Sequence, residues 1–464
     1  MYKLITLESY PPLHTIFSLV HQEDSVAFLD SSLQNELGRY SILGRSPYLQ
    51  LVQGEAFTVN GQPCEIPFQE YLKRYLKEHH AENTHPEVPL ISGGIGYFSY
   101  DYGREHMGIP SQWEKNVEIP EAVWTFYDQF LIEDYQTHRL YLIANDHLQS
   151  CEEGLAELQQ LVAQATTVVQ EEVHGSPSAV RANFTKEDYM DAVNRLIAYI
   201  VEGDVYIANM TQQLLLESNL TPYDLFCILR EKNPSPFGGF LQYRDFQVVS
   251  ASPERFLQMR NGLIETRPIK GTRKRGATVA EDNQMRKELE QSEKDRSELL
   301  MIVDLERNDL NRVCVPGSVT VRELFAVEAY ATVFHLVATV TGQLRPELDV
   351  VDLLDAVFPG GSITGAPKYR AMEIIDELEH SRRNLYTGSM GYLSLNGDCD
   401  LNIIIRTALH QKGTYHLGVG GGITCESEPE FEYEETLQKA KAIVTALNGI
   451  FPGEGEESDG TALR

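Results

Sequence analysis

The sequence has few positive charges for its length and lacks long apolar runs. Lys and Arg number 39 against 68 Asp and Glu in 464 residues, which gives a formal charge of -29. Proteins that bind nucleic acid or anionic membranes normally carry the opposite sign. No apolar run reaches the roughly 18 residues of a membrane helix, and the N-terminus lacks a signal-peptide pattern. We therefore expect a cytoplasmic protein that binds neither nucleic acid nor membrane.

The six cysteines are scattered and form no Cys-x-x-Cys pair. In a chain this long, such spacing is typical of free thiols in a reducing compartment. Repeats of fixed period are also missing, and so is the Gly-Lys-Ser/Thr order of a Walker A motif. With 42% apolar residues, the sequence predicts a globular protein of two or three domains or one large assembly.

Composition divides the chain into four regions. Residues 1–165 alternate short β-like runs with turns, and helical spacing appears at 68–78 and 150–165. Residues 166–180 have the composition of a linker. The larger region 181–452 begins with a helix that we expect Thr185 to cap. Residues 453–464 are rich in Gly, Glu and Ser, which predicts a disordered tail.

Lys270 is the first candidate for chemistry. Four further cations lie within five residues of it, namely Arg267, Arg273, Lys274 and Arg275. Neighbouring cations and partial burial lower the pKa of a lysine from about 10.4, and the deprotonated amine is a nucleophile. A solvated basic turn is the alternative, and the local residues do not decide between the two.

Glu254 and His335 are candidates for proton transfer. Glu254 follows a β-like run and precedes Lys270 by 16 positions. Two antiparallel strands joined by a turn would place these residues on neighbouring strands, where a carboxylic acid could protonate a leaving group. A surface turn is the alternative. His335 is flanked by apolar residues, which is also typical of a histidine in a core.

Two pairs of acidic residues have helical spacing. Asp295 precedes Glu298 by three positions, and Glu432 precedes Glu435 by three, so each pair lies on one helix face. If the two faces met, their carboxylates could bind Mg²⁺. Two solvated faces are the alternative in so acidic a protein.

Two Gly-rich segments and one arginine are candidates for binding an anion. Residues 359–368 end in Ala-Pro-Lys and open an amphipathic helix, whose N-terminus could hold an anion. Residues 418–423 could form a second cluster of free amides. Arg406 follows an apolar run, so we expect a buried cation that needs an anion such as a substrate carboxylate.

Six motifs, in their order along the chain, resemble the chorismate-utilising enzymes. They are Ser-Pro-Glu-Arg-Phe from 252, Thr-Arg-Pro-Ile-x-Gly-Thr from 266, Leu-Met-Ile-Val-Asp-Leu-x-Arg-Asn-Asp-Leu from 300, His-Leu-Val from 335, Gly-Ser-Ile-Thr-Gly-Ala-Pro-Lys from 361, and Gly-Gly-Gly-Ile from 420 with Glu-x-x-Glu-Thr from 432. The resemblance covers about residues 180–450 and, more weakly, the N-terminal part. It implies an α+β fold, a sandwich of two large antiparallel sheets with helices outside.

Within that family, the residue inside Pro-Ile-x-Gly-Thr differs between members. It is alanine in enzymes that form anthranilate and lysine in those that form 4-amino-4-deoxychorismate, and here it is Lys270. The resemblance thus implies that chorismate and ammonia react to 4-amino-4-deoxychorismate, toward 4-aminobenzoate and folate. A separate glutamine amidotransferase subunit would supply the ammonia. An anthranilate-forming enzyme and an inactive regulatory subunit are the alternatives.

The resemblance also implies residue roles. Lys270 would attack C2 of the ring, Glu254 would protonate the departing C4 hydroxyl, and His335 would assist in positioning. Mg²⁺ would be held by Glu298 and Glu435, with support from Asp295 and Glu432. The substrate would contact Thr266, Ser362, Tyr386, Arg406, Gly420, Gly421, Gly422 and Lys439.

Two places depart from the family pattern. Ile207 stands where many relatives have Gln and where isochorismate and salicylate synthases have a general-base Lys. Because Ile207 cannot activate water, the sequence argues against those two activities. The N-terminal part of some relatives holds tryptophan, and residues 29–32 lie where that pocket would be. Their match to the motif of inhibited enzymes is poor, so we do not expect feedback inhibition.

Overall fold

The computed structural model describes residues 1–165, 175–329 and 333–451. The predicted linker at 166–180 falls largely outside these residues, and the predicted tail at 453–464 falls wholly outside them. Among the described helices, none is both long and apolar enough to cross a membrane. No disulfide joins cysteines within the described residues.

Two large antiparallel sheets share a pair of long strands. These strands are β3 (Tyr40–Gln53) and β7 (Ala122–Asp134). The first half of β7 pairs with one sheet and the second half with the other. In β3 the register shifts between Pro47 and Leu49, next to Ser46 at a φ of 56°. A shift of this kind bends a strand, which lets the pair pass from one sheet to the other.

Each sheet contains strands from both the N-terminal and the C-terminal region. The first sheet adds to the shared pair β1 (Tyr2–Leu7), β8 (Arg139–Asn145), β2 (Ala27–Asp30), β12 (Phe237–Gln242), β13 (Gln247–Ser252), β22 (Thr407–Gln411), β23 (Thr414–Ile423), β11 (Ile207–Glu217), β10 (Arg181–Ala182) and β19 (Gly365–Ala366). The second adds β5 (Gln62–Pro63), β4 (Phe57–Val59), β6 (Gly93–Phe98), β20 (Ser389–Ser394), β21 (Cys399–Asn402), β14 (Arg255–Arg260), β15 (Leu263–Thr266), β18 (Val333–Gln343), β16 (Ile269–Lys274) and β17 (Thr320–Ala329). A short parallel pair joins β9 (Ser178–Ala179) to β24 (Gly449–Ile450). The predicted fold class is confirmed.

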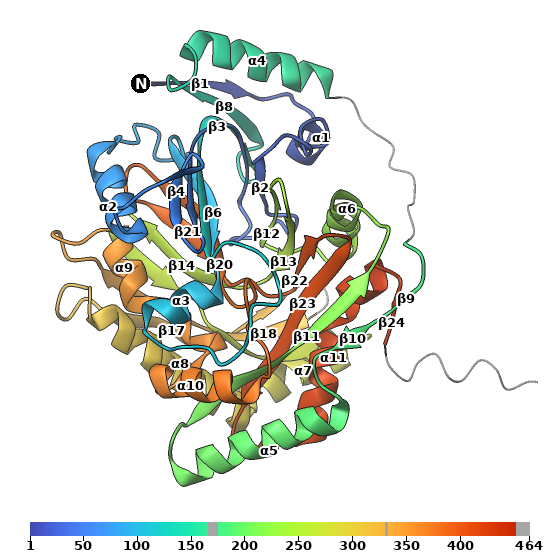
Figure 1. Ribbon diagram of the computed structural model, residues 1–464. Helices are drawn as coiled ribbons and strands as arrows, with labels where there is room; N and C mark the ends of the chain where they lie inside the picture. Colours follow the sequence, from blue (N-terminus) through green and yellow to red (C-terminus); the bar gives the residue numbers. More distant parts are fainter. Residues whose placement is uncertain (166–174, 330–332, 452–464) are drawn as a thin grey trace, which may run out of the picture.

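Helices surround the sheets (Figure 1). They are α1 (Leu13–Phe17), α2 (Phe68–Glu78), α3 (Tyr100–His106), α4 (Cys151–Gln164), α5 (Lys186–Glu202), α6 (Pro222–Lys232), α7 (Val279–Gln291), α8 (Glu293–Asn311), α9 (Val350–Val357), α10 (Lys368–Leu378) and α11 (Pro429–Ala446). The predicted start of α5 at Thr185 is confirmed. The Thr185 side chain accepts from the Asp188 amide, and Gly203 ends the helix with a φ of 90°.

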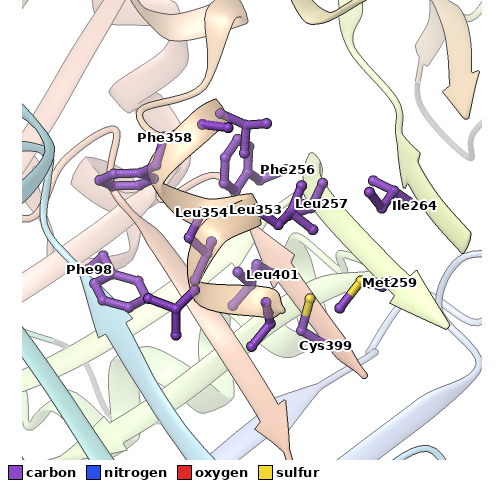
Figure 2. Packing of buried hydrophobic residues seen from close by; sticks show 14 of the residues in the cluster. Phe98, Phe256, Leu257, Met259, Ile264, Leu353, Leu354, Phe358, Cys399 and Leu401 are labelled. Atoms are coloured by element: carbon purple, nitrogen blue, oxygen red, sulfur yellow. The ribbon is translucent and has the colours of Figure 1, made fainter. Parts of the chain in front are cut away.

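A hydrophobic cluster holds the segments around the candidate site in place (Figure 2). Leu353 and Leu354 of α9 pack over the second sheet, together with Phe256 of β14 and Phe358. The Phe256 and Phe358 rings lie edge to face at 5.9 Å. Phe256 follows Glu254 by two residues, and Phe358 precedes the Gly-rich turn, so this core fixes two segments that carry predicted site residues.

Glu254 approaches Lys270 through the predicted arrangement of antiparallel strands. Strands β14 and β15 form a hairpin, in which Gln258 pairs with Glu265. β15 and β16 pair with the same strand, β18, in one continuous register. The hairpin register, continued beyond β14, therefore places Glu254 opposite Ile269, and the Ile269 amide hydrogen-bonds to the Glu254 carboxyl group next to Lys270.

Candidate active site

A cavity of about 580 Å³ brings together the predicted site residues with one exception. Its walls come from β16, β18, β23, α8, α11 and the 3-10 turn η1 (Gly361–Ile363). The predicted residues that line it are Glu254, Lys270, Asp295, Glu298, His335, Ser362, Tyr386, Arg406, Gly420, Gly421, Gly422, Glu432, Glu435 and Lys439. Thr266 is absent from this lining. It is buried, and its hydroxyl lies 2.9 Å from the Phe256 carbonyl.

The Lys270 amine lies in this cavity with one hydrogen bond. Its Nζ donates to the Ser362 carbonyl at 3.3 Å, and no carboxylate of the described residues forms an ion pair with it. The neighbouring arginines have partners of their own. Arg267 pairs with Glu328, Arg273 pairs with Asp295, and Arg275 pairs with Asp282. Their charges are therefore largely compensated, and among the described residues Lys270 faces the cavity without an ion pair.

The Gly-rich segment at residues 418–423 belongs to β23 and pairs with β11 along one edge. On the other edge β22 pairs with residues 414–417, so a cluster of free amides at 418–423 stays a prediction. The glycines also provide space. A Cβ atom on Gly422 would lie 3.2 Å from Lys270 Nζ, and one on Gly421 would lie 3.0 Å from Glu435 Oε2. The strand thus forms a floor without side chains, against which the lysine and the acidic residues lie.

Glu254 has the environment of a general acid. Its side chain is buried, and Ser362 Oγ donates to Oε1 at 2.8 Å. Burial raises the pKa of Glu254, although Ser362 and the charge of Lys270 act in the opposite direction. A carboxyl group with a raised pKa retains its proton closer to neutral pH, as a proton donor must.

His335 is neutral at physiological pH. Burial, together with the charge of Arg406, lowers its pKa to about 4. Its Nδ1 lies 2.9 Å from Thr272 Oγ1 on the paired strand β16. A neutral imidazole in this place can donate or accept a hydrogen bond, but it adds no charge to the cavity.

The two predicted acidic pairs face the same cavity from α8 and α11. Burial raises the pKa of both Glu298 and Glu432, and the nearby Glu435 raises that of Glu432 further. Cations lie among them. Asp295 accepts from Arg273 at 2.8 Å, Glu435 lies 3.3 Å from Lys439, and Glu432 lies 3.9 Å from Lys294.

This donor set fits a hard divalent cation in chemistry. Carboxylate oxygens are its preferred ligands, and clustered carboxylates with raised pKa values gain from a positive charge between them. In the described parts of the chain, no three metal-ligating side chains already stand within reach of one ion. An ion could be held here only if side chains that contact lysine or arginine turned toward it.

Arg406 also faces this cavity. It lies between β21 and β22 with a φ of 48°, and its guanidinium forms no hydrogen bond or ion pair within the described residues. Arg406 is an exposed residue, so the prediction of a buried cation is wrong. The protein around the guanidinium nevertheless lowers its pKa. Lys439 Nζ donates to the Gly420 carbonyl at 2.9 Å on the floor of the same cavity.

Glu306 is a half-buried acid that the sequence did not single out. It occupies the variable position of the motif from 300, and helical spacing cannot distinguish it from a solvated residue. In the structure its Oε2 lies 3.2 Å from Thr266 Oγ1. Burial raises its pKa well above the usual range, and Glu254 raises it further. Because the Thr266 hydroxyl also donates to the Phe256 carbonyl, a protonated Glu306 satisfies both bonds.

A larger cavity of about 750 Å³ lies elsewhere, where residues 29–31 meet β14 and β21. We do not assign the reaction to this larger cavity, because its arginines are already paired with acidic residues and are not available to a substrate carboxylate. Arg255 pairs with Asp400 at 2.9 Å, and Arg39 pairs with Asp134 at 2.7 Å. This is the region where the resemblance places a tryptophan pocket.

Comparison with known proteins identifies the class. Residues 31–445 match the profile of the chorismate binding enzyme family. Aminodeoxychorismate synthase component 1 of Klebsiella aerogenes is 44% identical over 363 residues, covering 78% of this chain and 79% of that protein. The same-named protein of Bacillus subtilis is 38% identical over 420 residues, covering 88% and 89%.

A solved structure agrees with this assignment. Anthranilate synthase component I from Streptococcus pneumoniae superposes with a TM-score of 0.80 at 30% identity, covering 89% of this chain and 93% of that one. The chain therefore belongs to the chorismate binding enzyme family, and the family predicted from the six motifs is confirmed.

Proposed function

We propose that this chain is an aminodeoxychorismate synthase component that converts chorismate and ammonia to 4-amino-4-deoxychorismate. The observation that carries the proposal is the Lys270 amine, which faces the cavity without an ion pair and lies close to the buried acid Glu254. An alanine at position 270 could not form a covalent bond to the substrate. The names of the relatives from Klebsiella aerogenes and Bacillus subtilis support the same reaction.

In the first step, Lys270 Nζ forms a bond to C2 of the ring. The two conjugated double bonds of the ring shift, the C4–O bond breaks, and the oxygen leaves as water with the proton of Glu254. The Lys270 nitrogen, which attacks as the neutral amine, then gives one proton to the Glu254 carboxylate, so the adduct is a neutral secondary amine. Covalent catalysis of this kind divides one difficult substitution into two easier steps. In the second step, ammonia forms a bond to C4, the two double bonds shift back, and the C2–N bond to Lys270 breaks.

The charges of the cavity suit a substrate with two carboxylates. Arg406 and Lys439 would bind one of them, and Tyr386 and Ser362 would line the ring. Glu298 and Glu435 would hold Mg²⁺, with Asp295 and Glu432 in support. The bound metal would offset the acidic residues and attract the other carboxylate, which matters in a chain with a formal charge of -29.

Ammonia would come from a separate glutamine amidotransferase subunit. The relatives are named as component 1, which supports a second component. Free ammonium salt should replace that subunit in a test of this chain alone, because the chemistry at C4 requires only ammonia.

The product decides between the candidate reactions. Purified chain, chorismate, Mg²⁺ and an ammonium salt should yield 4-amino-4-deoxychorismate by mass spectrometry. Anthranilate would instead indicate that the enzyme eliminates pyruvate and aromatises the ring. If chorismate binds but no product forms, the chain is an inactive subunit.

Removal of the proposed metal site should remove activity. We expect Glu298→Gln to lower kcat roughly 100-fold or more and to abolish the response to added Mg²⁺. In the wild type, a chelator should cause a similar loss of activity. Titration of Mg²⁺ against initial rate measures both effects. Asp304→Asn is the matched control, since Asp304 lies on the exposed face of α8 and pairs with Arg307. A Glu298→Gln variant that retains its rate would reject the metal assignment.

A further inference from the structure

Asn209 carries a buried oxygen atom that has no partner. The residue lies on β11, is 8% exposed and lines the candidate active site. Its Nδ2 donates to the Ile363 carbonyl at 3.3 Å, which fixes the orientation of the amide. Oδ1 is shielded from solvent and accepts no hydrogen bond within the described residues. Buried acceptors without a donor are rare in folded proteins. We therefore expect Oδ1 to accept a hydrogen bond from a bound molecule, since the described residues supply no donor.

The strand register places the Asn209 side chain on the sheet face that borders Lys270. Asn209 pairs directly with Gly422 of β23, and side chains of a directly paired set project on the same face of a sheet. On that face, a Cβ atom of Gly422 would lie 3.2 Å from Lys270 Nζ. Lys270 and Asn209 also donate to consecutive carbonyls, those of Ser362 and Ile363. The amide therefore borders the reacting amine.

The residue next to Asn209 on the same face of β11 is apolar. Ile207 lies two residues before Asn209 on the same face, and its Cδ1 would lie 3.4 Å from the same Gly422 Cβ position. Ile207 is buried and offers water no hydrogen bond. The space next to Lys270 thus combines an apolar wall, which disfavours water, with one unsatisfied acceptor.

We propose that Asn209 Oδ1 binds the ammonia that attacks C4, by accepting one of its N–H bonds. This inference rests on the proposed function. Ammonia is the reactant that has hydrogen-bond donors and no assigned acceptor, since Glu254 serves the departing hydroxyl while Arg406 and Lys439 serve a carboxylate. C4 is two bonds from the carbon that holds Lys270, so the ammonia must be bound close to that lysine before it attacks. A neutral amide oxygen also orients NH₃ without favouring the charged ammonium ion among so many cations.

The step balances in atoms and protons. The ammonia lone pair forms the C4–N bond while the two conjugated double bonds of the ring shift back and the C2–N bond to Lys270 breaks. The incoming nitrogen then carries one proton too many, and the departing Lys270 nitrogen requires one to leave as a neutral amine. One proton therefore moves from the new amino group to Lys270, and Asn209 remains unchanged.

Asn209→Leu separates ammonia binding from the first step. At constant pH we expect KM for ammonium chloride to rise about tenfold, which corresponds to the loss of one hydrogen bond. The rate of covalent adduct formation, measured with chorismate alone by intact-protein mass spectrometry, should change less than about twofold. That adduct also reports that the variant is folded. Asn209→Ala, which removes the acceptor with less steric change, should show the same selective rise in KM.

Gln212→Leu is the matched control. Gln212 is another buried amide on β11 with an unpartnered oxygen, but it donates to Thr436 and does not line the cavity. It should leave the ratio of amination to adduct formation as in the wild type. An unchanged KM for ammonium in Asn209→Leu and Asn209→Ala, or an equal loss of both steps, would overturn the role of Asn209. If the wild type itself forms neither adduct nor 4-amino-4-deoxychorismate, the proposed function fails instead.

Discussion

Lys270→Ala is expected to lower kcat roughly 1,000-fold or more and to abolish the covalent adduct with chorismate. The reason is that Lys270 forms and breaks a bond in both steps, and removal of a covalent nucleophile eliminates that route. Intact-protein mass spectrometry of the enzyme with chorismate, but without ammonia, measures the adduct. The fold should persist, since the side chain contributes one 3.3 Å hydrogen bond.

Lys274→Ala serves as the control for this experiment. Lys274 lies on the same strand, at the exposed end of β16, and does not line the cavity. Its variant should form the adduct at the wild-type rate. An adduct that persists in Lys270→Ala would show that another residue is the nucleophile.

Glu254→Gln should have the second largest effect, a loss of kcat of about 10²- to 10⁴-fold, the usual contribution of a general acid. Glutamine has nearly the same shape and can still accept a hydrogen bond from Ser362, but it has no proton to give to the leaving oxygen. Adduct formation, rather than substrate binding, should slow, because the C4–O bond breaks in that step. Single-turnover measurements with chorismate alone test this.

The pH dependence of the wild type should follow the protonated form of Glu254. Its pKa is raised, so the acid form is complete at low pH and is lost as pH increases through that raised pKa. The rate should therefore fall on the basic side. His335, with a pKa near 4, stays neutral there and does not account for such a decline. A basic decline that persists unchanged in Glu254→Gln would assign it to a different group.

Local sequence patterns predict those helices whose ends depend on contacts between residues close in the sequence. Helix α2 begins and ends where its apolar spacing does, and Thr185 and Gly203 bound α5 because capping and a left-handed φ depend on adjacent residues. The six motifs named most residues of the cavity, because each motif is a short segment that contributes one or two side chains to it.

Long-range pairing decides the remainder of the site. The sequence could not show that β16 joins β18, or that Gly-rich β23 lies flat in a sheet, because both depend on strands distant along the chain. Asn209 and Glu306 were missed for the same reason. Each looks like an ordinary strand or helix residue until its partner, Gly422 or Thr266, is known.

The glycines of β23 also determine which substitutions the protein can survive. At Gly418 a methyl group would lie 2.0 Å from the Tyr386 ring, and at Gly420 it would lie 2.4 Å from the Met210 carbonyl. Either substitution would therefore displace the surrounding structure. At Gly421 and Gly422 the nearest atoms belong to Glu435 and Lys270, at 3.0 and 3.2 Å, and these flexible side chains can move aside. Variation at the first two positions is thus limited by folding, whereas alanine at the last two should yield a stable protein that has lost its chemistry.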